Sequence, residues 1–177
     1  EVQDAIATAH ATFQTWRTTP FAERAVLMHR AADLLDEDNE SIARIMTLEM
    51  GKTLKSARAE AAKCAKGMRW YADNAERLLA DEPVDRATVG ALQAYARYAP
   101  LGVVLAVMPW NFPLWQVVRF AAPALMAGNV GLLKHASNVP QTALWLEELF
   151  RRAGFPDGAF STLLVGSDVV EQVLGDP

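Results

Sequence analysis

Two different spacings of apolar residues divide the chain. Over residues 1–80, apolar side chains recur every three or four positions, which predicts amphipathic helices. The first helix extends to Trp16, Pro20 starts the second, and Gly51 ends the third as a left-handed cap. The acidic segment 36–40 is expected to be a solvated linker between the second and third helices. The fourth helix has the most regular spacing. Its apolar seam, which is typical of packing against another helix, comprises Ala57, Ala61, Cys64, Met68, Tyr71, Ala75 and Leu78.

From residue 101 the spacing changes to short apolar runs separated by amphipathic stretches. The runs predict strands over 103–108, 130–134 and 161–165, and helices are expected over 114–126, 139–153 and 168–174. Asn138 and Gln141 have the spacing of a capping pair for the second of these helices, and Ser167 is expected to cap the third. This alternation predicts an α/β fold, in which a helical layer is followed by a parallel sheet with right-handed crossovers.

The segment between these halves, residues 81–100, has its own pattern. Residues 81–90 are polar, with Pro83 and Gly90, and are expected to be a linker. Residues 92–98 alternate apolar and polar positions, which predicts a strand with two different faces. Such a strand can pair with a partner subunit or lie at the edge of a domain.

Composition excludes several classes of function. The 177 residues are 51% apolar with a net charge of −4, which suits a soluble globular protein with a hydrophobic core and gives no indication of nucleic-acid binding. No apolar run approaches the roughly 18 residues that a membrane span needs. The single cysteine, Cys64, cannot form an internal disulfide and suits a reducing compartment, so we expect a cytoplasmic location. The three histidines are too widely spread for a metal site, and we expect no metal. Because the chain begins inside a helical pattern and stops soon after the alternation starts, we expect it to be part of a longer protein.

Two polar side chains fall where parallel sheets bind ligands, at the carboxyl ends of strands. Asn111 follows the first predicted strand, and Lys134 ends the second. A carboxamide in this position can direct its NH2 group at a developing negative charge, although Asn111 could instead cap the next helix. Cys64 lies on a packing face and is expected to be structural rather than a nucleophile. The dinucleotide fingerprint G-x-G-x-x-G is absent, so a nucleotide would have to bind without that loop.

Several motifs together resemble the aldehyde dehydrogenase superfamily. They are Pro-Leu-Gly-Val-Val at 100–104, Pro-Trp-Asn-Phe-Pro at 109–113, Ala-Pro-Ala-Leu at 122–125 with Gly-Asn at 128–129, Leu-Lys-His-Ala-Ser at 133–137 and Ala-Gly-Phe-Pro-Asp-Gly at 153–158. Upstream, Glu-Met-Gly-Lys at 49–52 resembles the Glu-x-Gly-Lys of the family. The resemblance implies that residues 1–80 are a helical part of the cofactor domain and 81–100 a linker with a bridging, oligomerising strand. Residues 101–177 would be the first half of a Rossmann-like open sheet, without the catalytic domain.

The resemblance also implies a reaction. A cysteine thiolate adds to an aldehyde, hydride leaves for a nicotinamide cofactor, and water activated by a glutamate hydrolyses the thioester to release an acid. In this scheme Asn111 is an oxyanion donor, and Met108, Pro109 and Trp110 line the cofactor. Neither the nucleophilic cysteine nor the general base is among the 177 residues, so these residues alone are expected to be inactive.

Positions 134 and 137 bear on the choice of cofactor. Lys134 resembles the family's lysine at the adenosine ribose, and a lysine suits a 2′-phosphate. Many family members carry a glutamate where this chain has Ser137, and a glutamate would repel that phosphate. NADP is therefore expected to bind, with NAD preference as the alternative if Ser137 only begins the helix cap.

Arg119 bears on the choice of substrate. It is similar to the arginine with which succinate-semialdehyde dehydrogenases hold a carboxylate, and it shares a helix face with Trp115 close to Phe112. The chain most resembles the bacterial NAD(P)-dependent enzymes of that kind, which implies oxidation of succinic semialdehyde by a dimer or tetramer. Phe120 departs from the lysine found in many family members. Arg119 could instead form a surface or interface ion pair. The alternative functions are an aldehyde dehydrogenase for an uncharged or aromatic aldehyde, with Arg119 turned away, or a truncated, non-catalytic homologue.

Overall fold

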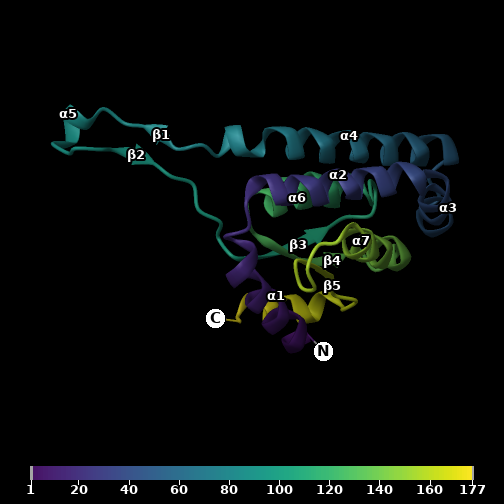
Figure 1. Cartoon of the computed structure of the whole chain (residues 1–177). Coiled ribbons are helices and arrows are strands. Elements are labelled where there is room, and N and C mark those ends of the chain that lie inside the picture. The colour runs from purple at the N-terminus through teal and green to yellow at the C-terminus, as the bar shows by residue number, and fades with distance from the viewer. Residues whose placement is uncertain (1, 177) are drawn as a thin grey trace.

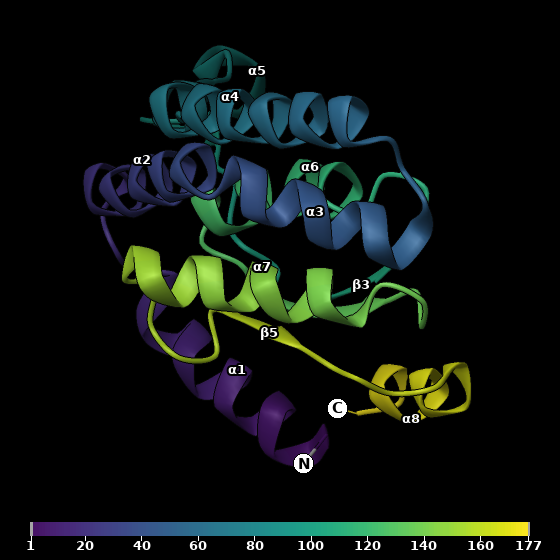
Figure 2. The same ribbon diagram turned by 90° about the vertical axis from the view of Figure 1, so that its right-hand side faces the viewer.

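The computed structural model describes residues 2–176 and contains a three-stranded parallel sheet in the order β3-β4-β5. The strands are β3 (Val103–Met108), β4 (Val130–His135) and β5 (Phe160–Thr162). Between them run α6 (Trp115–Met126) and α7 (Pro140–Ala153), which cover one face of the sheet, while α1 (Val2–Trp16) covers the other (Figure 1, Figure 2). The predicted α/β class is confirmed.

The helical layer lies outside α6 and α7. It comprises α2 (Phe21–Glu37), α3 (Asn39–Met50) and α4 (Leu54–Leu78), and α4 packs along both α2 and α6 (Figure 2). The predicted seam of α4 is buried from Ala57 to Ala75 apart from the half-buried Tyr71, whereas Leu78 at its end is 44% exposed. The helical part and the sheet therefore share one hydrophobic core.

The predicted linker at 36–40 is wrong. Helix α2 continues to Glu37 and α3 begins at Asn39, so only Asp38 separates them. The acidic residues are solvated because they lie on the outer face of helices, where Asp36 and Glu40 pair with arginines. Charge alone therefore did not distinguish a helix surface from a loop.

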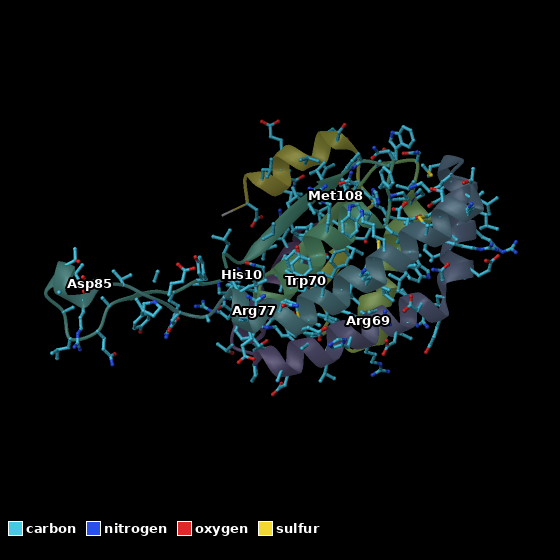
Figure 3. The ribbon with its side chains drawn as sticks, turned by 90° about the horizontal axis from the view of Figure 1, so that it is seen from above. His10, Arg69, Trp70, Arg77, Asp85 and Met108 are labelled. Atoms are coloured by element: carbon cyan, nitrogen blue, oxygen red, sulfur yellow. The ribbon has the colours of Figure 1, made fainter. Side chains whose placement is uncertain are left out.

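Residues 81–100 form a projection rather than a linker and a long strand. The short strands β1 (Glu82–Pro83) and β2 (Tyr95–Ala96) pair antiparallel and are joined by α5 (Arg86–Val89). Figure 1 shows this hairpin extending away from the body, and Figure 3 shows Asp85 at its tip. Only two residues of the predicted strand 92–98 have strand pairing, and nearly all the side chains of the projection are exposed.

The strands differ in burial. Every residue of β4 is buried, but in β3 only Ala106 is, and Val107 is 56% exposed. The apolar run over 103–108 indicated a fully buried strand, and this expectation is wrong because β3 pairs on one side only among the described residues. Strand β5 is shorter than predicted and is followed by η1 (Ser167–Val169) and α8 (Val170–Leu174), where Ser167 makes no side-chain cap. Within residues 2–176, no helix is long and apolar enough to cross a membrane.

Candidate functional site at the carboxyl edge of the parallel sheet

Strands β3 and β4 end side by side, so the turns that follow them lie at the same edge of the sheet. The register pairs Val107 with Lys134 and Met108 with His135. Asn111 is exposed in the turn after β3, Lys134 is 8% exposed at the end of β4, and Ser137 is exposed in the turn after β4. The structure thus places the predicted polar residues at one edge, as the alternation of strands and helices indicated.

The first amides of α6 are capped by Glu60, not by Asn111. The Leu114 and Trp115 amides donate to Glu60 Oε1 at 3.0 and 2.9 Å, and α6 has no cap from a neighbouring side chain. The alternative in which Asn111 is a capping residue is therefore wrong. A carboxylate suits this place because a helix N-terminus carries partial positive charge and unpaired N–H groups.

A buried lysine connects Glu60 to the turn. Lys52 forms an ion pair with Glu60, and the two side chains are only 8% and 3% exposed. Lys52 Nζ also lies 4.0 Å from the ring centre of Phe112, which makes a cation–π contact. Phe112 follows Asn111 directly. The ion pair therefore contacts the turn in two places, through Lys52 at the Phe112 ring and through Glu60 at the start of α6.

His135 holds the same turn from the other strand. Its Nε2–H donates to the Pro113 carbonyl at 2.9 Å, while its Nδ1 accepts from the Ala136 amide at 2.9 Å. The accepting Nδ1 carries no proton, so the imidazole is neutral. Burial lowers the pKa of His135, chiefly because charging the ring there would require desolvation.

This histidine makes a testable contribution to stability. The unfolded chain binds a proton at His135 near its ordinary pKa of about 6.5, whereas the folded chain resists protonation. The stabilisation is therefore complete above that value and is lost as the pH falls towards the lowered pKa. In the full-length protein, wild type is expected to have a higher free energy of unfolding than His135→Gln. This difference should shrink by up to about 1.4 kcal/mol per pH unit below pH 6.5. Thermal unfolding across this range measures it, and exposed His10→Gln is the control. An advantage that does not change with pH would contradict the assignment.

A second carboxylate caps the next helix. Glu49 accepts from the Gln141 and Thr142 amides at 2.6 and 3.0 Å and from Thr142 Oγ1 at 2.6 Å. The predicted capping pair of Asn138 and Gln141 is wrong, because Asn138 is exposed and makes no cap. Glu49 and Lys52 belong to the Glu-Met-Gly-Lys motif, which ends α3 at Gly51 with φ of 75° as predicted. The motif thus supplies the cap of α7, Glu49, and also Lys52, the counter-ion of the Glu60 cap on α6.

A cavity opens beside the second turn. It has a volume of about 250 Å³ and is lined by Ser137, Pro140, Leu163 and Val165, among others. It lies at the ends of β4 and β5, where Ser137 offers a hydroxyl. Lys134 Nζ makes no hydrogen bond or ion pair within residues 2–176. The Ser137 hydroxyl is available to a ligand in this cavity, whereas Lys134 does not line it.

The residues predicted to contact substrate lie along the start of α6. Trp115 is half-buried, with Lys63 Nζ 3.8 Å from its ring centre, and Phe112 is 47% exposed. Arg119 is exposed one turn further along the helix, and the described part of the chain offers it no ion pair. The alternative, an ion pair of Arg119 at the surface, is thus not formed among residues 2–176, and an ion pair at a subunit interface stays an alternative.

The structure also confirms the structural role of Cys64. Its side chain is fully buried, and burial raises its pKa, so the reactive thiolate is disfavoured. Among residues 2–176 there is no group of three histidine, cysteine or acidic residues able to hold a metal.

Comparison with known proteins identifies the family. Residues 1–177 match the Aldehyde dehydrogenase family. The chain is 67% identical over all 177 residues to succinate-semialdehyde dehydrogenase [NADP(+)] 1 of Mycobacterium tuberculosis, and it spans 39% of the length of that relative. A succinic semialdehyde dehydrogenase from Streptococcus pyogenes in complex with NADP+ is 38% identical with a TM-score of 0.93, over 98% of this chain and 38% of that one. A methylmalonate-semialdehyde dehydrogenase from Oceanimonas doudoroffii is 30% identical with a TM-score of 0.92, over 99% and 36%. The chain is therefore a member of the aldehyde dehydrogenase family.

Proposed function

We propose that the chain is part of an enzyme that oxidises succinic semialdehyde to succinate and transfers hydride to NADP+. The observation that carries this proposal is the 67% identity to a succinate-semialdehyde dehydrogenase [NADP(+)], which extends over all 177 residues and so includes the turn with Asn111 and the helix with Arg119. The structural likeness alone favours no substrate, because a methylmalonate-semialdehyde dehydrogenase has nearly the same fold. The choice of substrate therefore depends on individual side chains.

Asn111 is the proposed oxyanion donor. When a thiolate adds to the aldehyde carbon, the carbonyl oxygen gains negative charge, and an NH2 group already directed at it stabilises that charge. Support comes from the exposed position of Asn111 beyond β3 and from the contacts of Glu60, Lys52 and His135 with the turn around it. The thiolate is not supplied by Cys64, which is the only cysteine of the chain and is buried.

The cofactor is proposed to lie along the same edge. Met108, Pro109 and Trp110 would line its nicotinamide side, and Trp110 is 51% exposed as that role requires. Lys134 and Ser137 would hold the ribose and its 2′-phosphate beside the cavity lined by Ser137. The cofactor, when bound, supplies the hydride acceptor, and these residues orient it.

A glutamate at position 137 should reverse the cofactor preference. In the full-length enzyme, Ser137→Glu is expected to raise the KM for NADP+ by roughly 10- to 100-fold, because two like charges would meet at the 2′-phosphate. The KM for NAD+ should change by a few-fold at most or improve. Ser137→Gln is the control, because glutamine is nearly the same size as glutamate but carries no charge. Parallel increases for both cofactors in both variants would show that steric hindrance, not charge, is responsible.

Arg119 is proposed to bind the carboxylate of the substrate, with Phe112 and Trp115 beside its carbon chain. An exposed guanidinium without an ion pair in the described part of the chain is available for a bidentate contact. The competing assignment is an aldehyde dehydrogenase for an uncharged aldehyde. It would be favoured if the enzyme used butanal as well as succinic semialdehyde.

We also propose that the full-length protein is a cytoplasmic homo-oligomer, a dimer or tetramer, in which the exposed hairpin of β1 and β2 contacts another subunit. The test of the proposed function is NADPH formation by the full-length protein with succinic semialdehyde, accompanied by light scattering for the subunit number. No reduction of NADP+ or NAD+ with any aldehyde would favour the non-catalytic homologue instead.

A further inference from the structure

The two helices that follow β3 and β4 begin in the same unusual way. Each has its first amides capped by a carboxylate that is distant in sequence, Glu60 for α6 and Glu49 for α7. Glu60 lies 54 residues before Leu114, and Glu49 lies 92 residues before Gln141. The helical layer therefore determines where both helices start, and with them the two turns at the carboxyl edge of the sheet.

Glu60 has the more buried and more specific environment. Its side chain is 3% exposed, and its two oxygens have different partners: Oε1 accepts from the Leu114 and Trp115 amides, whereas Oε2 faces Lys52. A buried carboxylate with a buried counter-ion is costly to desolvate and is stabilised only when its geometry is well satisfied. A gain in stability is therefore a weak explanation for this buried ion pair. A stronger explanation is that the pair holds the neighbouring turn in one conformation.

We propose that Glu60, with Lys52 as its counter-ion, is a positioning residue that sets the direction of the Asn111 amide. This inference rests on the proposed function, because it requires Asn111 to meet the substrate oxygen. Asn111 lies three residues before Leu114, so the place where α6 starts determines the backbone on one side of the turn. The cation–π contact of Lys52 with Phe112 and the hydrogen bond of His135 to the Pro113 carbonyl fix the intervening residues. A donor displaced by about 1 Å can lose roughly 100-fold in rate.

Glu49 provides a matched comparison within the same chain. It is also a carboxylate that caps a helix after a strand, but its helix is preceded by the turn with Ser137 rather than the turn with Asn111. If Glu60 acted only through stability, loss of either carboxylate should have the same kinetic consequence. If Glu60 positions the amide, the two losses should affect different kinetic constants.

The first experiment compares Glu60→Gln with Glu49→Gln in the full-length enzyme. Glu60→Gln should lower kcat by roughly 10- to 100-fold and leave the KM for NADP+ within about twofold. Glu49→Gln should raise the KM for NADP+ by roughly three- to tenfold, with a kcat loss below about threefold. Peptide-level hydrogen exchange of the cofactor-free proteins is a readout independent of activity. Exchange should become faster over 112–118 in Glu60→Gln and over 140–145 in Glu49→Gln.

The second experiment separates the role of Glu60 from that of Lys52. Glu60→Gln alone leaves Lys52 buried without its partner, which could itself disturb folding. The double variant Lys52→Met/Glu60→Gln removes both charges, and its kcat should stay low if the carboxylate positions the turn. A kcat within about twofold of wild type in the double variant would overturn the proposal, as would equal kcat losses in Glu60→Gln and Glu49→Gln. Failure of wild type to oxidise any aldehyde would instead reject the proposed function, and the inference with it.

Discussion

Replacing Asn111 with alanine in the full-length enzyme is expected to lower kcat by about 100- to 1,000-fold. The carboxamide would stabilise the negative charge that develops on the aldehyde oxygen, and loss of one preorganised donor typically has this effect. Because the interaction strengthens as charge develops, kcat and kcat/KM should fall together. The KM for NADP+ should stay close to that of wild type, since the proposed ribose contacts come from the turn after β4. Steady-state kinetics with succinic semialdehyde measures these constants.

Asn138→Ala is the matched control for that experiment. Asn138 is also an exposed asparagine in a turn after a strand of the same sheet, and it makes no side-chain cap. Its loss should leave kcat within about twofold, since exposed positions without such contacts usually tolerate substitution. If Asn111→Ala lowered kcat no more than Asn138→Ala does, the proposed role of Asn111 as an oxyanion donor would be rejected.

The second large effect concerns Arg119 and the charge of the substrate. Arg119→Ala should raise the KM for succinic semialdehyde by roughly 10- to 100-fold, because charge-assisted hydrogen bonds to the carboxylate are worth about 1.5–3 kcal/mol. The KM for butanal, which has no carboxylate, should change less than about threefold. The ratio of the two KM changes therefore reports the contact with the carboxylate, because a general disturbance of the site would raise both KM values.

Two further variants make the result for Arg119 specific. Arg119→Lys keeps the positive charge but loses the planar fork, so it should recover only part of the affinity. Arg30→Ala removes another exposed arginine from α2, outside the carboxyl edge, and should leave both KM values unchanged. Equal losses of affinity for the two aldehydes in Arg119→Ala would reject the carboxylate contact and favour an uncharged substrate.

Local patterns predicted much of the architecture. The apolar seam of α4, the left-handed end of α3 at Gly51 and the alternation of strands and helices after residue 101 all appear in the structure. Each of these features depends on residues within a few positions of one another. The placement of Asn111 and Lys134 at one edge is not local, but it follows from the connectivity of parallel strands.

The errors about the helix caps arose where distant residues determine the local structure. The Asn138–Gln141 spacing suggested a cap, but a carboxylate 92 residues upstream of Gln141 takes that place. Glu60 gave no signal of its own, because it lies beside the seam of a helix and its partners are 54 and 55 residues away. The Glu-Met-Gly-Lys motif did mark Glu49 and Lys52, but only the three-dimensional structure shows what they contact.

The two carboxylate caps also bear on how a dinucleotide can bind. In many nucleotide-binding folds the diphosphate lies against the free N-terminus of a helix that follows a strand, where glycines allow close approach. Here Glu60 and Glu49 already occupy the starts of α6 and α7, so a diphosphate at either place would meet a carboxylate instead of unpaired N–H groups. No glycine fingerprint follows β3, and the helix start where a diphosphate would bind is occupied by the Glu60 carboxylate. If the proposed cofactor binds at this edge, we expect its diphosphate to lie away from both helix starts, with the adenosine end beside β4.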